Sequence, residues 1–163
     1  MIDEPNTSGS NFQTACRSLR LFTAGSRRFA IFEDQIATIA EWREPAALPH
    51  APDSVIGVLG IQGRMLTVLD LARIAARGLG AESPQDNPQR QVLALRGDEQ
   101  LALAVDEVGE TIEIPDHILD VKSEKDGLVL AVFKHADTEI SIIDSKQLFP
   151  HAIQGRERRR RRF

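Results

Sequence analysis

The sequence predicts an all-β protein made of two packed β-barrels with a few short helices. Short segments rich in aliphatic and β-branched residues follow one another along the 163 residues, and tight turns join them in pairs. A polar segment from Gly80 to Gln91 contains two prolines and divides the paired segments into two groups. Each group of about 60 residues is too small to bury much apolar surface alone, so the two groups are expected to share an interface.

Four β-hairpins account for the strands, in chain order. The first joins Leu19–Thr23 to Arg28–Phe32 across a turn at residues 24–27. The same plan recurs three times, with Gly57–Ile61 and Met65–Asp70 across Gln62-Gly63-Arg64, Val92–Leu95 and Leu101–Val105 across Gly97-Asp98-Glu99, and Leu128–Phe133 and Glu139–Ile143. Several hairpins at this close spacing favour barrels or a sandwich.

Three short helices are expected between the strands. The first spans residues 34–42, because Ile36 and Ile39 share one face at helical spacing. The second and third, at residues 70–78 and 144–148, each begin at an aspartate that is suited to cap a helix. Helices this short depend on packing rather than on propensity, so they are expected to lie on the barrels.

Charge and composition divide the chain into three parts. Residues 1–17 are rich in Ser, Asn, Thr and Gly, which predicts a flexible N-terminal segment before a domain at residues 18–150. The basic C-terminal tail, residues 151–163, ends in a run with six Arg and one Glu at positions 156–163. This run has a net charge of +5 and the remaining chain, with 14 basic and 23 acidic residues, has −9.

The charge distribution limits the possible partners. An acidic body argues against a nucleic-acid groove on the folded part, since phosphate binding requires a basic surface. The arginine run has two interpretations, as a solvated tail or as an electrostatic tether for an acidic partner, an anionic lipid or nucleic acid. No secretory signal and no apolar run of about 18 residues is visible, so a cytoplasmic location is expected, with only indirect contact with a membrane.

Patterns typical of catalysis and metal binding are not visible. The four histidines lie far apart, and none has an acid or a second histidine at ligand spacing. No serine stands in a nucleophile elbow, and the single cysteine, Cys16, has no partner for an internal disulfide. We therefore expect no catalytic residue, no cofactor or metal, and no small-molecule substrate.

Short motifs stand in a characteristic order along the chain. They are Arg28–Ile31, Ile36–Ile39, Leu48–Pro52 and the run from Val55 to Leu71 in the first half, then Leu103–Val108 with Ile112 and Ile114, and Ile142–Asp144 with Leu148. In this order they resemble the CheW family of bacterial chemotaxis adaptors, over about residues 18–150. The resemblance implies two SH3-like five-stranded β-barrels packed on each other, and no enzyme activity.

The same resemblance implies a function in signalling. Members of the family connect the cytoplasmic tips of transmembrane chemoreceptors to a histidine kinase whose regulatory domain has the same double-barrel fold. Ile36, Gly57 and Gly63 match positions near the receptor- and kinase-contacting surfaces, and Val105 and Asp106 match the second-barrel motif. Each has a structural interpretation as well, Ile36 as a core residue and the two glycines through their backbone conformation.

At two positions the chain departs from the family pattern. Gln62 stands where an Arg usually precedes the turn glycine, and Thr38 stands where a Glu is usual. Both changes remove a charge from an expected contact surface, for which Arg64 is a partial substitute, and a buried charged contact contributes about 2 kcal/mol or more. They predict an adaptor of a specialised chemosensory array, such as one that governs surface motility or type IV pili.

Two other functions stay open at this stage. One is a nucleic-acid-binding module, or another β-barrel interaction module, that uses the arginine-rich tail; the other is a hydrolase whose nucleophile escapes pattern analysis. An adaptor also requires exposed apolar surface, for which Ile36, Ile39, Val58 and Val108 are the candidates.

Overall fold

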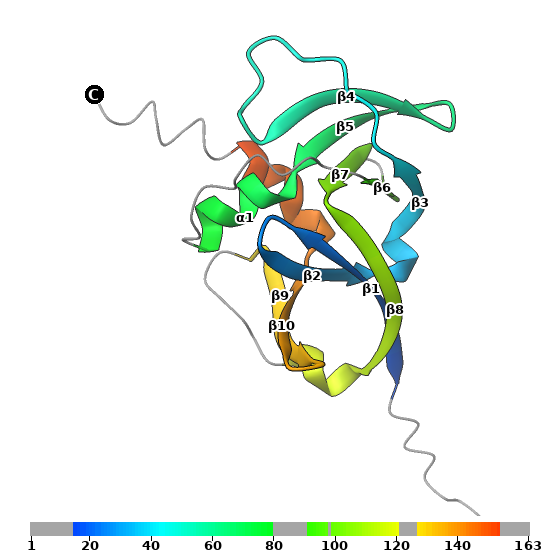
Figure 1. Cartoon of the computed structure of the whole chain (residues 1–163), viewed down its shortest axis with the longest axis vertical. Helices are drawn as coiled ribbons and strands as arrows, with labels where there is room; N and C mark the ends of the chain where they lie inside the picture. Colours follow the sequence, from blue (N-terminus) through cyan, green and yellow to red (C-terminus); the bar gives the residue numbers. More distant parts are fainter. Residues whose placement is uncertain (1–14, 80–90, 98, 121–126, 154–163) are drawn as a thin grey trace, which may run out of the picture.

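The computed structural model describes residues 15–79, 91–97, 99–120 and 127–153, which form two five-stranded β-sheets (Figure 1). Sheet A has the strand order β8-β1-β2-β10-β9, and sheet B has the order β3-β6-β7-β5-β4. Each sheet curves around a core of its own, and a third core lies where the two sheets pack together. The predicted all-β class with two packed five-stranded units is confirmed.

Sheet A combines strands from both ends of the chain. Its strands are β1 (Cys16–Ala24), β2 (Arg27–Phe32), β8 (Glu107–Pro115), β9 (Val129–His135) and β10 (Thr138–Ile143). The pairs β1–β2, β1–β8 and β9–β10 are antiparallel, whereas β10 runs parallel to β2. The hairpins predicted at β1–β2 and β9–β10 are therefore confirmed.

Sheet B takes its strands from the middle of the chain. They are β3 (Ile36–Glu41), β4 (Val55–Ile61), β5 (Arg64–Asp70), β6 (Gln91–Leu95) and β7 (Leu101–Val105). The pairs β3–β6, β4–β5 and β6–β7 are antiparallel, and β5 runs parallel to β7. The two remaining predicted hairpins, β4–β5 and β6–β7, are present.

The predicted division of the strands at residues 80–91 is wrong. β6 and β7 follow that segment, yet they lie in sheet B with β3, β4 and β5. β1 and β2 precede it, yet they lie in sheet A with β8, β9 and β10. Turn residues predict only that two consecutive strands pair with each other. The parallel pairs β2–β10 and β5–β7 instead join segments far apart in the sequence, which no turn residue indicates. Residues 80–90 themselves lie outside the described residues.

Three clusters of buried apolar side chains form the core. One lies within sheet A and contains Leu19 and Ile140; a second lies within sheet B and contains Leu66 and Val68. The largest, here named the seam cluster, draws residues from both sheets, and its larger members include Phe22, Phe29, Ile31, Leu69, Leu93, Leu103 and Ile143. The central strands of both sheets are thus covered on two faces, and each sheet needs the other to bury its apolar side chains.

The helix expected at residues 34–42 is wrong. A short 3-10 helix, η1 (Glu33–Gln35), leads directly into strand β3. The register between β3 and β6 shifts at Ala37, which is the extra residue of a β-bulge. The bulge brings Ile36 and Ile39 to the same side, where both pack on the seam cluster. A spacing of three residues on one face therefore arose from a bulged strand rather than from a helix.

The other two predicted helices are present, with different ends. α1 (Leu71–Leu79) begins after Asp70, whose Oδ1 accepts a hydrogen bond of 3.3 Å from the Arg73 amide. Near the C-terminus, η3 (Ser145–Gln147) leads into a helix at residues 148–153 that continues past Pro150. Proline is tolerated there because the first turn of a helix requires no hydrogen bond from its N–H.

The limits of the folded part differ slightly from the expected ones. β1 begins at Cys16 and pairs with Pro115, so two residues of the expected N-terminal segment belong to sheet A. The 3-10 helix η2 (Asp116–Asp120) then follows β8. Residues 1–14 and 154–163 lie outside the described residues, so the flexible segment and the arginine-rich tail stay predictions.

Candidate protein-protein interface

The turn of the β4–β5 hairpin contains two of the predicted binding residues. Gln62 and Gly63 are the two turn residues, and both have positive φ angles, of 50° and 76°. Two successive positive φ angles are typical of a type I′ turn, which suits the twist of a two-residue hairpin. Arg64, expected in the turn, is the first residue of β5 and pairs with Ile61. All three predicted residues are exposed, so the turn projects into solvent.

An exposed methionine adjoins this turn. Met65 is 62% exposed, and its Sδ lies 3.6 Å from the position that a Cβ would take on Gly60. Val58, half-buried, shares this outward side of the hairpin, because Leu66 and Val68 point into the sheet B core. Met65 was not among the predicted binding residues, although its alternation with the buried Leu66 indicates an outward side chain.

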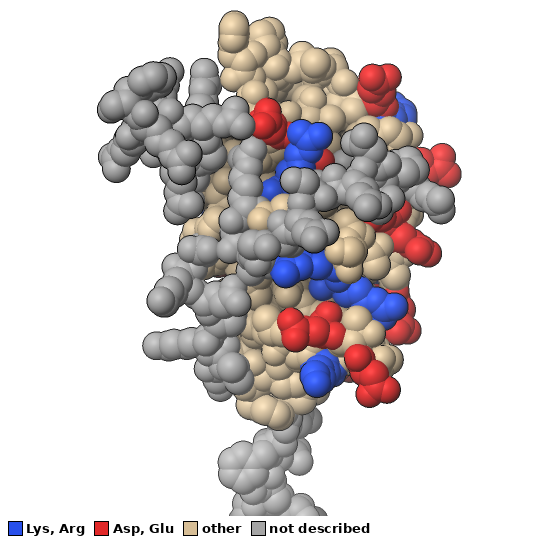
Figure 2. Space-filling view, turned by 60° about the vertical axis from the view of Figure 1, so that its left-hand side comes forward, with Lys and Arg blue, Asp and Glu red and all other residues tan. Residues whose placement is uncertain are grey.

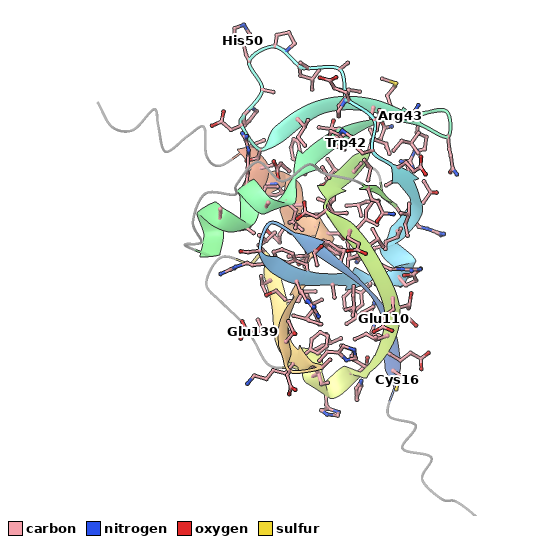
Figure 3. All side chains as sticks on the ribbon, in the orientation of Figure 1. Cys16, Trp42, Arg43, His50, Glu110 and Glu139 are labelled. Atoms are coloured by element: carbon pink, nitrogen blue, oxygen red, sulfur yellow. The ribbon has the colours of Figure 1, made fainter. Side chains whose placement is uncertain are left out.

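Two arginines flank the hairpin. Arg64 Nη2 donates to the Gly97 carbonyl oxygen at 3.4 Å, and Arg43 Nη2 donates to the Gly60 carbonyl oxygen at 2.7 Å. Figure 3 shows Trp42 and Arg43 beyond the end of β3, reaching toward β4 and β5. Both arginines are exposed, so the surface presents an apolar centre with positive charge beside it. We name this the hairpin surface, comprising Val58, Gly60, Gln62, Gly63, Arg64 and Met65.

Thr38 lies on a strand outside the β4–β5 hairpin. It is half-buried on β3, opposite Ala94 of β6. β3 and β4 are the two outer strands of sheet B, with β6, β7 and β5 between them. The two positions at which the chain departs from the family pattern therefore lie on different elements, Thr38 on strand β3 and Gln62 in the turn between β4 and β5.

Gly57 is required by a close backbone approach. A Cβ at this position would overlap the carbonyl oxygen of Ala46 and contact Pro45. That approach is fixed by two hydrogen bonds, from the Ala46 amide to the Val58 oxygen at 2.9 Å and from the Val58 amide to the Ala46 oxygen at 2.8 Å. The residue is buried in β4, so its local environment accounts for glycine without a partner protein.

Packing and backbone contacts hold the three remaining predicted residues. Ile36 is 7% exposed and Val105 is fully buried, and both belong to the seam cluster. The amide of Asp106 donates to the Thr23 carbonyl oxygen at 2.8 Å, which joins the start of β8 to the end of β1. These positions hold the two sheets together, and the exposed part of the predicted set is confined to the β4–β5 turn.

The apolar surface differs from the expected one. Of the four candidates, Ile36 is buried in the seam cluster, and Ile39, Val58 and Val108 are half-buried. Among the residues that the structure describes, the large apolar side chains that are exposed are Leu48 at 42%, Met65 at 62%, Phe149 at 40% and Ile153 at 41%.

An ion pair fixes η1 to sheet A. Arg20 donates to both carboxylate oxygens of Glu33, at 2.9 and 2.8 Å, and the Thr111 hydroxyl donates to Glu33 at 3.5 Å. The hydrogen bonds from Arg20 lower the pKa of Glu33 below its usual value, against the opposing effect of burial. The same contact raises the pKa of Arg20.

Replacing Glu33 with glutamine is expected to destabilise the protein slightly, in a pH-dependent way. Because the pKa of Glu33 is lowered on folding, its stabilising effect is full above the unfolded-state pKa of about 4.3 and is lost as the pH falls through the lower folded-state pKa. The side chain is 36% exposed, so the expected difference near neutral pH is about 1 kcal/mol or less. Urea unfolding at neutral and acidic pH measures it.

The control for this prediction is Glu113→Gln, at an exposed position on β8. It is expected to leave the unfolding free energy unchanged at both pH values. A Glu33→Gln protein that is as stable as the parent near neutral pH would show that the Arg20 contact contributes nothing to folding.

A cavity of about 540 Å³ opens between η1, the β6–β7 turn and η3. Its lining includes Asp34, Arg96, Glu99, Ser145 and Lys146, and contains no histidine or cysteine. Across the described ranges, no group of three or more His, Cys, Asp or Glu side chains is placed to hold a metal ion. In the same ranges, no helix has the length and apolar character needed to cross a membrane.

Known proteins with similar sequences and folds share one family. The probable chemotaxis protein CheW of Rhizobium etli is 28% identical over 110 residues, which are 66% of this chain and 68% of the relative. The chemotaxis protein CheW of Bacillus subtilis is 25% identical over 122 residues, 75% of this chain and 71% of the relative.

A solved structure and a family model agree with these relatives. The crystal structure of the scaffolding protein TtCheW from Thermoanaerobacter tengcongensis matches with a TM-score of 0.65 at 17% identity, over 80% of this chain and 90% of that protein. The fold is therefore the one found in that scaffolding protein. The model of the CheW-like domain matches residues 18–152, so this chain belongs to the CheW-like domain family.

Proposed function

We propose that this protein is a non-catalytic adaptor that connects the cytoplasmic tips of chemoreceptors to a CheA-type histidine kinase. Membership of the CheW-like domain family supports this function, as do relatives that are named chemotaxis proteins. An adaptor acts by presenting complementary surfaces, so its function depends on which exposed side chains its fold holds in place. The hairpin surface is the observation that carries the proposal.

The hairpin surface has the composition of a protein-binding site. Met65 supplies an exposed, adaptable apolar side chain, and Arg64 supplies a charged donor beside it; both residue types are enriched in interfaces. The type I′ turn at Gln62 and Gly63 is a fixed backbone conformation, so little ordering entropy is lost when a partner docks. We assign this surface to the regulatory domain of the kinase.

The neutral residue at the exposed turn supports a specialised array. Gln62 projects into solvent, where a charged side chain would be free to contact a partner. A complementary charge contact sets partner choice, so its absence favours a kinase whose own surface lacks the matching charge. A second charge of the family pattern is missing at Thr38, which is half-buried on the separate strand β3.

Calorimetric titration of the purified protein with the regulatory domain of each histidine kinase from its own genome tests the proposal. We expect binding to one domain that serves a specialised array, and weaker binding to the domain of the main chemotaxis kinase. Gln62→Arg is expected to increase affinity for the main kinase. Tight binding to the main kinase that Gln62→Arg leaves unchanged would contradict the specialised array, and binding to none would contradict the adaptor function.

Replacing Met65 with glutamate is expected to weaken kinase binding by about tenfold or more, because a charge would enter the apolar centre of the interface. The fold should be unaffected, since Met65 is 62% exposed. The matched control is Leu48→Glu, which places the same charge at a residue 42% exposed in the loop between β3 and β4. Equal loss of affinity in both variants would remove the hairpin surface from the proposal.

A further inference from the structure

Arg43 joins the loop after β3 to the outer edge of strand β4. β4 is an outer strand of sheet B, and Val58 directs both its backbone N–H and its carbonyl oxygen to Ala46 in that loop. Gly60, two residues further along β4, directs its carbonyl oxygen to the same outer side. That oxygen accepts the hydrogen bond of 2.7 Å from Arg43 Nη2. The exposed guanidinium group is therefore held at the edge of the hairpin.

The chain on either side of Arg43 is held as well. Trp42 is half-buried and packs on the core of sheet B, while Ala46 exchanges two hydrogen bonds with Val58. Little freedom is left to lose at Arg43 when a partner binds. Arg64, in contrast, donates to the Gly97 carbonyl oxygen over 3.4 Å, which is long for a hydrogen bond. Of the two arginines beside the hairpin, Arg43 has the more firmly held charge.

The positive charge and the apolar centre of the hairpin surface meet at Gly60. Gly60 pairs with Met65 of β5, and Met65 Sδ lies 3.6 Å from the position that a Cβ would take on Gly60. The absence of a side chain at Gly60 thus leaves room for Met65 on one face of the strand. Arg43 binds the carbonyl oxygen of the same residue. A partner that covers Met65 would therefore come within reach of the Arg43 guanidinium group.

This guanidinium group has donors to spare. Although Glu41 and Glu44 are close in sequence, no ion pair joins Arg43 to an acidic side chain among the described residues. On the face that carries α1, shown in Figure 2, most basic side chains lie close to acidic ones. Arginine has five N–H donors in a planar fork, and Gly60 accepts from one of them. The others suit the two oxygens of a carboxylate.

We propose that Arg43 determines partner specificity by pairing with a carboxylate on the kinase regulatory domain. The inference rests on the proposed kinase-binding function of the hairpin surface, and it adds the chemistry of the partner. Gln62 leaves the turn itself neutral, so the positive charge stands at the outer edge of β4, beside Met65. A regulatory domain with an acidic side chain opposite this edge would be bound, whereas one with a basic side chain there would be rejected.

Calorimetric titration of the full chain with the kinase regulatory domain that it binds tests the role of Arg43. Arg43→Gln removes the charge and is expected to weaken binding by about tenfold. The matched control is Arg28→Gln, which removes the same charge from an exposed position on β2, in sheet A. It should leave the affinity nearly unchanged. Urea unfolding verifies that both variants are folded.

The salt dependence of binding separates a charge contact from a structural role of Arg43. Raising the salt concentration from about 0.05 M to about 0.3 M should weaken binding of the parent several-fold and that of Arg43→Gln much less. Equal salt dependence, or parental affinity in Arg43→Gln, would overturn the charge contact and leave the adaptor function standing. Failure of the parent to bind any kinase domain would instead overturn the adaptor function, and the role of Arg43 with it.

Discussion

Replacing Phe29 with alanine is expected to destabilise the protein by about 3–5 kcal/mol. Phe29 is fully buried in β2, within the seam cluster, and its ring stacks on Phe22 with centroids 5.9 Å apart and an angle of 26° between the ring planes. The substitution would leave a cavity between sheet A and sheet B, so residues of both sheets would lose contacts. Urea unfolding followed by circular dichroism measures the change.

Phe149→Ala is the control, since that ring is 40% exposed and its removal should lower the unfolding free energy by clearly less than Phe29→Ala does. A single cooperative transition is expected for Phe29→Ala, shifted to lower denaturant. Two separate transitions, with only one of them shifted, would show that the sheets are stable independently and that the seam cluster does not couple them.

Replacing Gly57 with alanine is expected to destabilise the protein by about 1–3 kcal/mol. The new methyl group would overlap the Ala46 carbonyl, so either the two hydrogen bonds between Ala46 and Val58 must break or the strand must shift. Thermal unfolding measures the loss. Gly60→Ala is the matched control in the same strand, because a Cβ there meets only the flexible Met65 side chain, at 3.6 Å.

The Gly57→Ala protein also separates the two interpretations of this residue. If Gly57 acts through the backbone, stability should fall while the folded protein binds the kinase domain with nearly unchanged affinity. If Gly57 contacts a partner, affinity should fall with little change in stability. Calorimetric titration at a temperature where the variant is folded decides between them.

Local signals explain why the hairpins were predictable. Each pair of strands has alternating or continuous apolar residues next to a turn, and turns such as Gln62-Gly63 require residues that tolerate positive φ. Sheet membership was not predictable by the same means, since β10 pairs with β2 across most of the chain. The bulge at Ala37 accounts for the wrong helix prediction at residues 34–42, because one inserted residue changes a period of two into an apparent period of three.

The candidate site was predictable only in part. The exposed turn residues Gln62 and Gly63 and the adjoining Arg64 were predicted, while Met65 was not, although it alternates with the buried Leu66. The role of Gly57 depends on a contact with Ala46, which lies in a loop with no strand signal of its own. Sequence reasoning therefore located the hairpin but did not separate its exposed residues from those required for packing.

The interleaved order of the strands has a consequence for how the chain folds during synthesis. The β1–β2 hairpin emerges early from the ribosome, but its parallel neighbour β10 is among the last strands to appear. Until then the seam cluster that contains Phe22 and Phe29 lacks its last members, Ile143, Leu148 and Ala152. A topology with such distant strand pairs folds slowly. Until β10 is made, the β1–β2 hairpin is expected to expose apolar side chains to which chaperones bind. Sheet B corresponds to one continuous stretch, from β3 to β7, but sheet A has strands on both sides of that stretch, so no single cut between strands separates the two sheets.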